Sequence, residues 1–212
     1  MKQLAIFVSG GGSNFRKIHG ATKSGEIPAR VARVVTDKPH CPAADYARDQ
    51  GIEVVHYPAP DMEPPALLRA LEQASVDFII LAGYLKLVPS EVVRAYPRAM
   101  LNIHPALLPA FGGKGYYGRR VHEAVIASGA KVSGVSVHFV DEEYDHGPIV
   151  AQVVVPVRSD DTPDALAKRV LKQEHRLYSR VVAALCRGEV HWREDGVPYM
   201  EPPIMLQDIT KL

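Results

Sequence analysis

Apolar runs separated by short polar breaks predict the elements of this chain. Most of the runs do not alternate with polar residues, which is typical of parallel strands buried on both faces. The strand-like runs cover residues 4–8, 31–35, 52–55, 78–82 and 99–103. The segments between them predict helices. One begins near Phe15, and the others cover residues 43–49, 62–74 and 90–96. This alternation predicts an α/β fold: a Rossmann-like open, mostly parallel twisted sheet with helices on both faces.

The second half of the chain continues the pattern and adds a strand with an unusual face. The predicted elements are a helix at residues 119–128, strands at 132–140 and 149–155, a long helix at 163–187 and a short, loosely packed edge strand in the tail 191–212. One face of the strand 132–140 carries Gly134, Ser136 and His138. A small, polar face of this kind is typical of a strand that looks at solvent or at a site.

The sequence of the long helix predicts both of its ends and places one charged residue, Glu174, among its apolar positions. Thr162 is a suitable N-cap, Pro163 fits the first helical position, and Gly188 ends the helix. Glu174 falls within the apolar stripe, where an unpaired carboxylate would be costly. A structural salt bridge is the commoner explanation for such a residue, and a bound polar ligand is the functional one.

Length, charge and cysteine content narrow the class of protein. A chain of 212 residues suits one domain, residues 1–212, and a formal net charge of +1 predicts no basic surface for a nucleic acid. No apolar stretch approaches the roughly 20 residues of a membrane span, and the first residues carry no signal pattern. Cys41 and Cys186 lie far apart, so neither a disulfide framework nor a cysteine zinc site is predicted. We therefore expect a cytoplasmic monomer or homodimer that binds small molecules and needs no metal, nucleic acid or membrane.

The first strand-like run leads directly into Ser9-Gly10-Gly11-Gly12-Ser13-Asn14 and then into a helix. In this arrangement backbone N–H groups at the helix start point at an anion, and glycines let the chain approach it closely. The side chains of Ser13 and Asn14 add donors. The spacing fits neither a P-loop nor a dinucleotide fingerprint, so we expect a single phosphate monoester. A tight turn before a capped helix is the plain alternative.

A second group of polar residues follows the run at residues 99–103. Asn102 and His104 lie two residues apart, which places both side chains on one face of a strand that Pro105 ends. Ligands of open α/β sheets bind at the carboxyl ends of the strands, so an amide and an imidazole would point at the site together. A histidine satisfied within the protein is the plain alternative.

Three loops supply further candidates. Asp145 lies in the acidic turn 141–148, for which a solvated hairpin is the alternative. The apolar residues after Gly83 favour the wall of a flat ligand site or a plain core loop. The glycine-rich segment 112–118 predicts either a lid or a structureless connector.

An amide, an imidazole and a carboxylate without a serine or cysteine nucleophile favour acyl transfer by direct attack of a substrate amine. In that chemistry the amide stabilises the developing oxyanion and the imidazole moves a proton. The carboxylate orients the imidazole and raises its pKa.

Five stretches together resemble a known family. They are Ser9-Gly-Gly-Gly-Ser-Asn14, Leu81-Ala-Gly-Tyr84, Leu101-Asn-Ile-His-Pro-Ala-Leu-Leu-Pro109, Ser136-Val-His-Phe-Val140 and Asp145-His-Gly-Pro148. In this combination the chain resembles the phosphoribosylglycinamide formyltransferases, which are folate-dependent enzymes of purine biosynthesis.

The resemblance implies transfer of the formyl group of the co-substrate 10-formyltetrahydrofolate to the amine of 5-phosphoribosylglycinamide. It implies that Asn102 binds the formyl oxygen, that His104 donates the proton, and that Asp145 raises the pKa of His104. The N-terminal half would bind the ribonucleotide phosphate and the C-terminal half would bind folate and carry catalysis. The implied ribonucleotide residues are Gly12, Ser13, Asn14 and, on the ribose, Glu174. The implied folate residues are Leu85, Lys86, Leu87, Val88, Asn102, Asp141, Glu142, Glu143, Tyr144 and Asp145, with Ser136 and His138 supporting the catalytic residues.

Three alternatives stay open from the sequence. A formyltetrahydrofolate hydrolase has a similar core but gives the formyl group to water, and it usually carries an N-terminal regulatory domain. A methionyl-tRNA formyltransferase would add an RNA-binding domain and a basic surface. A non-enzymatic phosphate-binding module would need the glycine loop but not Asn102, His104 and Asp145 together.

Overall fold

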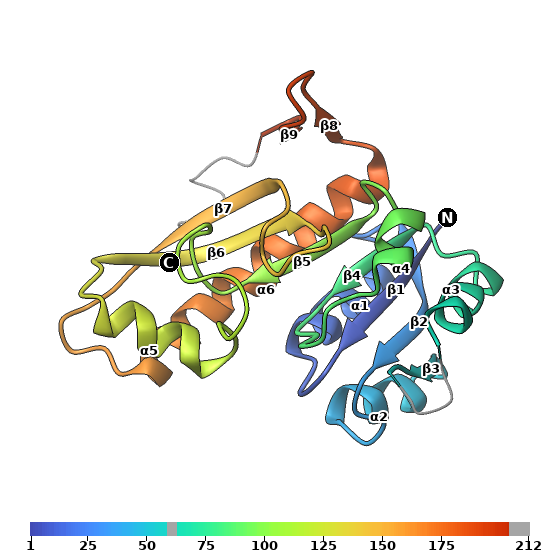
Figure 1. Cartoon of the computed structure of the whole chain (residues 1–212), viewed down its shortest axis with the longest axis horizontal. Helices are drawn as coiled ribbons and strands as arrows, with labels where there is room; N and C mark the ends of the chain where they lie inside the picture. Colours follow the sequence, from blue (N-terminus) through green and yellow to red (C-terminus); the bar gives the residue numbers. More distant parts are fainter. Residues whose placement is uncertain (59–62, 204–212) are drawn as a thin grey trace. The chain divides into compact units, whose positions relative to one another are not determined.

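The computed structural model describes residues 1–58 and 63–203 of the chain. The predicted α/β class is confirmed, because strands and helices alternate through most of this part (Figure 1). The first seven strands and five helices are β1 (Lys2–Val8), α1 (Ser13–Ser24), β2 (Ala29–Thr36), α2 (Pro42–Asp49), β3 (Glu53–His56), α3 (Pro64–Gln73), β4 (Phe78–Leu81), α4 (Ser90–Ala95), β5 (Met100–His104), α5 (Arg119–Ala127), β6 (Val132–Phe139) and β7 (Ile149–Pro156). The last elements are α6 (Pro163–Arg187), β8 (Val190–Trp192) and β9 (Pro198–Met200).

Seven strands form one mostly parallel sheet in the order β3-β2-β1-β4-β5-β6-β7. The pairs β1–β2, β1–β4, β2–β3 and β4–β5 are parallel, whereas β6 and β7 are antiparallel. The first four strands follow the βαβ connections that the sequence predicts. The antiparallel pair arises because the turn 141–148 is too short for a crossover helix, and such a turn joins only antiparallel neighbours.

By internal contacts the chain divides into two compact units, Met1–Asn102 and Ile103–Leu212. In the first unit β1 pairs with β2 on one side and β4 on the other, and its residues from Leu4 to Val8 are fully buried. The helix α1 begins directly after the glycine loop and buries Phe15 and Ile18. The continuous apolar run of β1 is therefore explained by burial on both faces.

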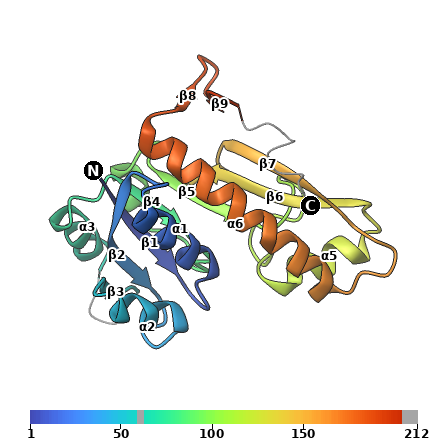
Figure 2. The same ribbon diagram turned by 180° about the vertical axis from the view of Figure 1, so that it is seen from behind.

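In the second unit the long helix α6 runs along β6 and β7, and Figure 2 shows it crossing in front of these two strands. The cross-strand pair Val135 and Val153 is buried on one face of the β6–β7 ribbon. The predicted helix ends are confirmed: the Thr162 hydroxyl accepts a hydrogen bond from the Ala165 N–H, and Gly188 is the left-handed C-cap.

Several predicted details are wrong. The tail contains a two-stranded antiparallel hairpin, β8–β9, rather than one edge strand, because Arg193 and Val197 close a turn by a backbone hydrogen bond. The helix expected at residues 62–74 begins at Pro64 with Glu63 as N-cap, and Met62 lies outside the described residues. Of the two alternatives for the polar face of β6, solvent or a site, solvent is wrong, because Ser136 and His138 both lie inside the protein.

Candidate active site

The carboxyl end of β5 places His104 in a buried position with an acceptor at each ring nitrogen. Its Nδ1 lies 3.3 Å from Asp145 Oδ2, and its Nε2 lies 2.8 Å from the backbone carbonyl of Phe111. A carbonyl can only accept, so Nε2 carries a hydrogen and donates it to Phe111. Because Asp145 also accepts, a protonated imidazole satisfies both contacts at once. His104 is therefore a buried histidine with both ring nitrogens paired, as the plain alternative expected, but one of its two partners is the carboxylate of Asp145.

Asp145 differs from the rest of the acidic turn because it faces inward. Its side chain is 10% exposed, and it also approaches a second imidazole, with Oδ1 3.7 Å from His138 Nε2. The backbone N–H of Gly113 donates to Oδ2 at 3.0 Å. Burial alone would raise the pKa of Asp145, but the two histidines and the Gly113 N–H hold it well below its usual range. The solvated-hairpin alternative is wrong for this residue.

The backbone around this cluster is strained. Phe111 and Asp145 both have φ of +55°, in the left-handed region that costs a non-glycine residue about 1–2 kcal/mol. Gly112 lies between Phe111 and the Gly113 contact, and a Cβ there would collide with the Leu108 side chain and approach Asp145. Through backbone groups, Phe111 and Gly113 contact His104 and Asp145 respectively.

His138 and His122 add two more buried imidazoles to the second unit. His138 lies at the end of β6, where a register shift follows Val137, and its Nδ1 donates to the Phe139 carbonyl at 2.8 Å. That bond leaves Nε2 directed at Asp145. Burial and the nearby His104 lower the pKa of His122, whose Nδ1 has no hydrogen-bond partner in the described structure. The structure therefore groups His104, His138 and Asp145, as predicted.

Asn102 lies on β5 two residues before His104, so strand alternation puts both side chains on the same face. It is half-buried and pairs in register with Leu81 of β4. An amide N–H is a suitable donor for a carbonyl oxygen that becomes negative during a reaction.

The glycine loop after β1 has the features of an anion site. Gly12 is the N-cap of α1 in the left-handed conformation with φ of +70°, and no side chain caps the helix. A Cβ at Gly12 would meet Ala43, whose N–H already donates to the Gly10 carbonyl at 3.1 Å. Ser13 is exposed as the first helical residue, and Asn14 is buried beside it. No acidic residue lies in the first turn, so the positive end of the helix dipole stays uncompensated there.

The predicted folate segments are loops in both units. In the first unit the Leu85 N–H donates to the Ser9 hydroxyl at 2.9 Å, which fixes the loop after β4 beside the loop after β1. Leu85 and Leu87 are 41% and 44% exposed, whereas Val88 is buried. In the second unit, Tyr144 is 38% exposed, and Asp141 pairs with His146 at 2.6 Å. Glu142 and Glu143 are exposed, as is Lys86 of the first unit.

Glu174 is half-buried in α6 next to the buried Gln173. The Gln173 Oε1 atom has no hydrogen-bond partner among the described residues. A polar segment inside an apolar stripe fits a ligand contact as well as a structural one, and both sequence alternatives for Glu174 stand.

Sequence reasoning missed three contributors to the site. Phe111 and Gly113 act through backbone groups, which leave no trace in residue type. Gln152 is the one polar residue in the apolar run of β7, and its side-chain amide reaches the Leu108 carbonyl at 3.0 Å. This single polar residue in an apolar run was the feature of the sequence that could have identified Gln152.

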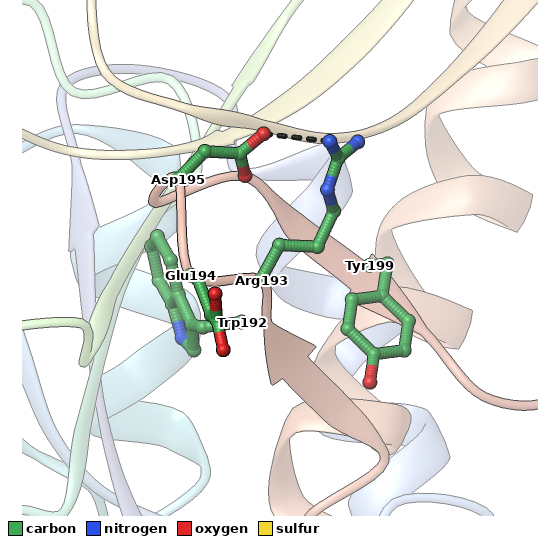
Figure 3. A pocket seen from close by; sticks show the side chains of 5 residues that line it. All are labelled: Trp192, Arg193, Glu194, Asp195 and Tyr199. Atoms are coloured by element: carbon green, nitrogen blue, oxygen red, sulfur yellow. Dashed lines mark hydrogen bonds and ion pairs between the residues drawn. The ribbon is translucent and has the colours of Figure 1, made fainter.

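A pocket lies in the β8–β9 hairpin. It is lined by Trp192, Arg193, Glu194, Asp195 and Tyr199 (Figure 3). Arg193 and Asp195 pair with each other at 2.6 Å, and the Trp192 ring stacks on Phe139 with centroids 4.7 Å apart. The hairpin is thus attached to the end of β6.

Across residues 1–58 and 63–203, no three histidine, cysteine, aspartate or glutamate side chains are grouped to hold a metal ion. Within the same part of the chain, none of the helices has the length and apolar character to cross a membrane.

Comparison with known proteins gives consistent matches. The family model described as formyl transferase matches residues 2–182. The chain is 56% identical to the chloroplastic phosphoribosylglycinamide formyltransferase of Vigna unguiculata over 94% of its own length and 66% of that protein's length. It is 36% identical to the phosphoribosylglycinamide formyltransferase of Bacillus subtilis over 89% of its own length and 99% of that protein. The crystal structure of glycinamide ribonucleotide transformylase 1 from Symbiobacterium toebii is similar with a TM-score of 0.83 and 35% identity, over 92% of each chain.

Proposed function

The chain belongs to the family of phosphoribosylglycinamide formyltransferases, and we propose that it transfers the formyl group of 10-formyltetrahydrofolate to the amine of 5-phosphoribosylglycinamide. The observation that carries the proposal is the pairing of both His104 ring nitrogens, one with Asp145 and the other with the Phe111 carbonyl, on the strand that carries Asn102.

The proposed reaction needs no covalent enzyme intermediate. The ribonucleotide amine attacks the formyl carbon and forms the new C–N bond, while the carbonyl electron pair moves to oxygen. The Asn102 amide stabilises this oxyanion. When the pair returns, the bond between the formyl carbon and the folate nitrogen breaks, and that nitrogen takes up the proton that the attacking amine loses. Nothing is oxidised or reduced, and the products are tetrahydrofolate and the formylated ribonucleotide.

His104 carries the proton in this scheme, and Asp145 orients its ring. The pKa of Asp145 lies well below its usual range, so it stays ionised throughout the neutral range and can accept a hydrogen from His104 Nδ1. In the structure, His104 Nε2 donates to the Phe111 carbonyl. We propose that this hydrogen bond is exchanged for one to the substrate during the reaction, which gives the loop 111–118 the role of a lid.

The remaining predicted residues divide between the two substrates. The left-handed Gly12, the exposed Ser13 and the N-terminus of α1 support binding of the ribonucleotide phosphate, together with Asn14. Glu174 is proposed to bind the ribose hydroxyls. Exposed Leu85 and Leu87 support contact with a flat pterin, with Lys86 and Val88 in the same loop. Asp141, Glu142, Glu143 and Tyr144 are proposed to line the folate site from the second unit. Under this proposal one domain, residues 1–212, binds the phosphate with its first half and carries out catalysis with its second.

The test is an assay of formyl transfer with and without the ribonucleotide. Purified chain is mixed with 10-formyltetrahydrofolate, and tetrahydrofolate and formylated ribonucleotide are both quantified. Equal amounts of the two products, formed only with the ribonucleotide, are expected. Release of tetrahydrofolate without the ribonucleotide would contradict the proposal in favour of a hydrolase. Binding of both ligands without turnover would contradict it in favour of a binding module.

Two finer expectations join the proposal. We propose that the protein acts in the cytoplasm as a monomer or homodimer. The plant relatives are named chloroplastic, so imaging of the tagged full-length protein in its source cells distinguishes the compartments. Sedimentation at several protein concentrations gives the oligomeric state.

A further inference from the structure

The turn 105–109, which follows His104, is held by two side chains from the next strands. The Ser136 hydroxyl donates to the Ala106 carbonyl at 2.7 Å and accepts from the Leu108 N–H at 2.9 Å. The Gln152 amide nitrogen donates to the same hydroxyl at 2.8 Å and to the Leu108 carbonyl at 3.0 Å. A hydroxyl offers one donor and two acceptor positions, and an amide nitrogen offers two hydrogens, so this clamp uses the full capacity of both groups.

We propose that Gln152 is a positioning residue for His104. The proposal rests on the proposed function, in which His104 carries the proton. Gln152 fixes the Leu108 carbonyl, and three residues further along the chain the Phe111 carbonyl accepts the hydrogen of His104 Nε2. The Leu108 side chain also lies against Gly112, which in turn abuts Asp145. The placement of the turn therefore sets the acceptor on each side of the imidazole.

The strand register explains why the side chain of Gln152 reaches the turn 105–109. Ser136 and Gln152 are direct cross-strand partners in the β6–β7 ladder, so their side chains emerge on the same face. On that face Gly134 leaves room for Leu107, since a Cβ at position 134 would collide with the Leu107 side chain. The turn can therefore lie close enough to the ribbon for a glutamine amide to reach its backbone.

Substitution of Gln152 is expected to change the stability of the protein only slightly, because the position is exposed. Gln152 is exposed on β7, and Val154, the next residue on the same face, is 53% exposed. Substitutions at exposed positions usually change stability little beyond the hydrogen bonds they remove. A loss of activity that exceeds the loss of stability at this position would thus report on the site.

The experiment compares the wild type with Gln152→Met, Gln152→Glu and the control Val154→Ala. Methionine keeps the length of the side chain without its donors, and glutamate puts an acceptor opposite the Leu108 carbonyl. We expect kcat to fall about tenfold in Gln152→Met and further in Gln152→Glu, with KM for both substrates within about twofold of wild type. The pH profile of kcat and the ¹⁵N shifts of the His104 ring should change in the same order. Val154→Ala should match the wild type in all readouts.

The outcomes separate the inference from the function it rests on. An active wild type with unchanged kcat, pH profile and imidazole shifts in both Gln152 variants would overturn the positioning role. A fall in kcat that simply follows a fall in Tm, with the wild-type imidazole shifts, would also overturn it. If the wild type transfers no formyl group, the proposed function fails. The ¹⁵N shifts of His104 in Gln152→Glu then still support or refute positioning by themselves.

Discussion

Two glycine-rich loops follow strands in this protein, and they use their backbones in opposite ways. In the loop after β1, residues 9–14, the Gly10 carbonyl accepts from the Ala43 N–H and the Gly12 carbonyl accepts from the Arg16 N–H, and Ser13 is left exposed at the helix start. In the loop 111–118 after β5, the Phe111 carbonyl and the Gly113 N–H are already bonded to His104 and Asp145. Under the proposed function, the first loop binds the phosphate of the ribonucleotide, whereas the second holds the side chains that carry the reaction. Binding and chemistry are therefore expected to respond separately to substitution.

The largest effect is expected from His104→Ala. Loss of the group that moves the proton should lower kcat about 100- to 10,000-fold, while KM for the ribonucleotide changes little. Steady-state kinetics on both substrates measures this. Retention of near-wild-type kcat would exclude His104 from the chemistry.

Gly112→Ala tests the second loop without touching a reactive group. The added Cβ would collide with Leu108 and approach Asp145, so we expect a loss of about 1–3 kcal/mol of stability and a lower kcat. Gly20→Ala, in the open surroundings of α1, is the control and should leave both unchanged or slightly raise the stability. If Gly112→Ala behaves like Gly20→Ala, the packing of this loop does not position Asp145.

The third prediction concerns stability and pH. The pKa of Asp145 is depressed in the folded protein, so its contribution to stability is complete above the ordinary carboxyl pKa of about 3.9 and is lost as the pH falls toward the folded value. Asp145→Asn should therefore be about 2 kcal/mol less stable than wild type at pH 7, and the gap should narrow at pH 3. Urea unfolding at both values measures this, with the exposed Asp49→Asn as control. A gap that widens in acid would contradict the assignment.

The smallest effect is expected in the first loop. Ser13→Ala removes one neutral hydrogen-bond donor, so KM for the ribonucleotide should rise about fivefold while kcat stays unchanged. The KM for 10-formyltetrahydrofolate is the internal control. An equal rise in both KM values would mean that Ser13 acts on the fold and not on the phosphate.

The contrast between the loops also explains how far the sequence could be read. Gly12 and Ser13 stand between an apolar run and a helix start, and the strands of the first unit carry continuous apolar runs, so the loop and these strands were predictable. Asp145 could be named from sequence, but its inward orientation depends on the Gly113 N–H and the His104 ring, which both lie far away in the chain. Gln152 depends on the register of β6 and β7, which apolar periodicity does not specify. The β8–β9 hairpin was missed because its strands are only three residues long and combine polar and apolar residues without a clear pattern.

The measurement that tests the account most directly is a side-by-side determination of kcat and ribonucleotide KM for Ser13→Ala and His104→Ala. The account predicts that Ser13→Ala changes KM alone and that His104→Ala changes kcat alone, because one loop binds the phosphate and the other holds the proton-carrying histidine. Equal losses of kcat in the two variants, or a His104→Ala enzyme that differs only in KM, would contradict this division.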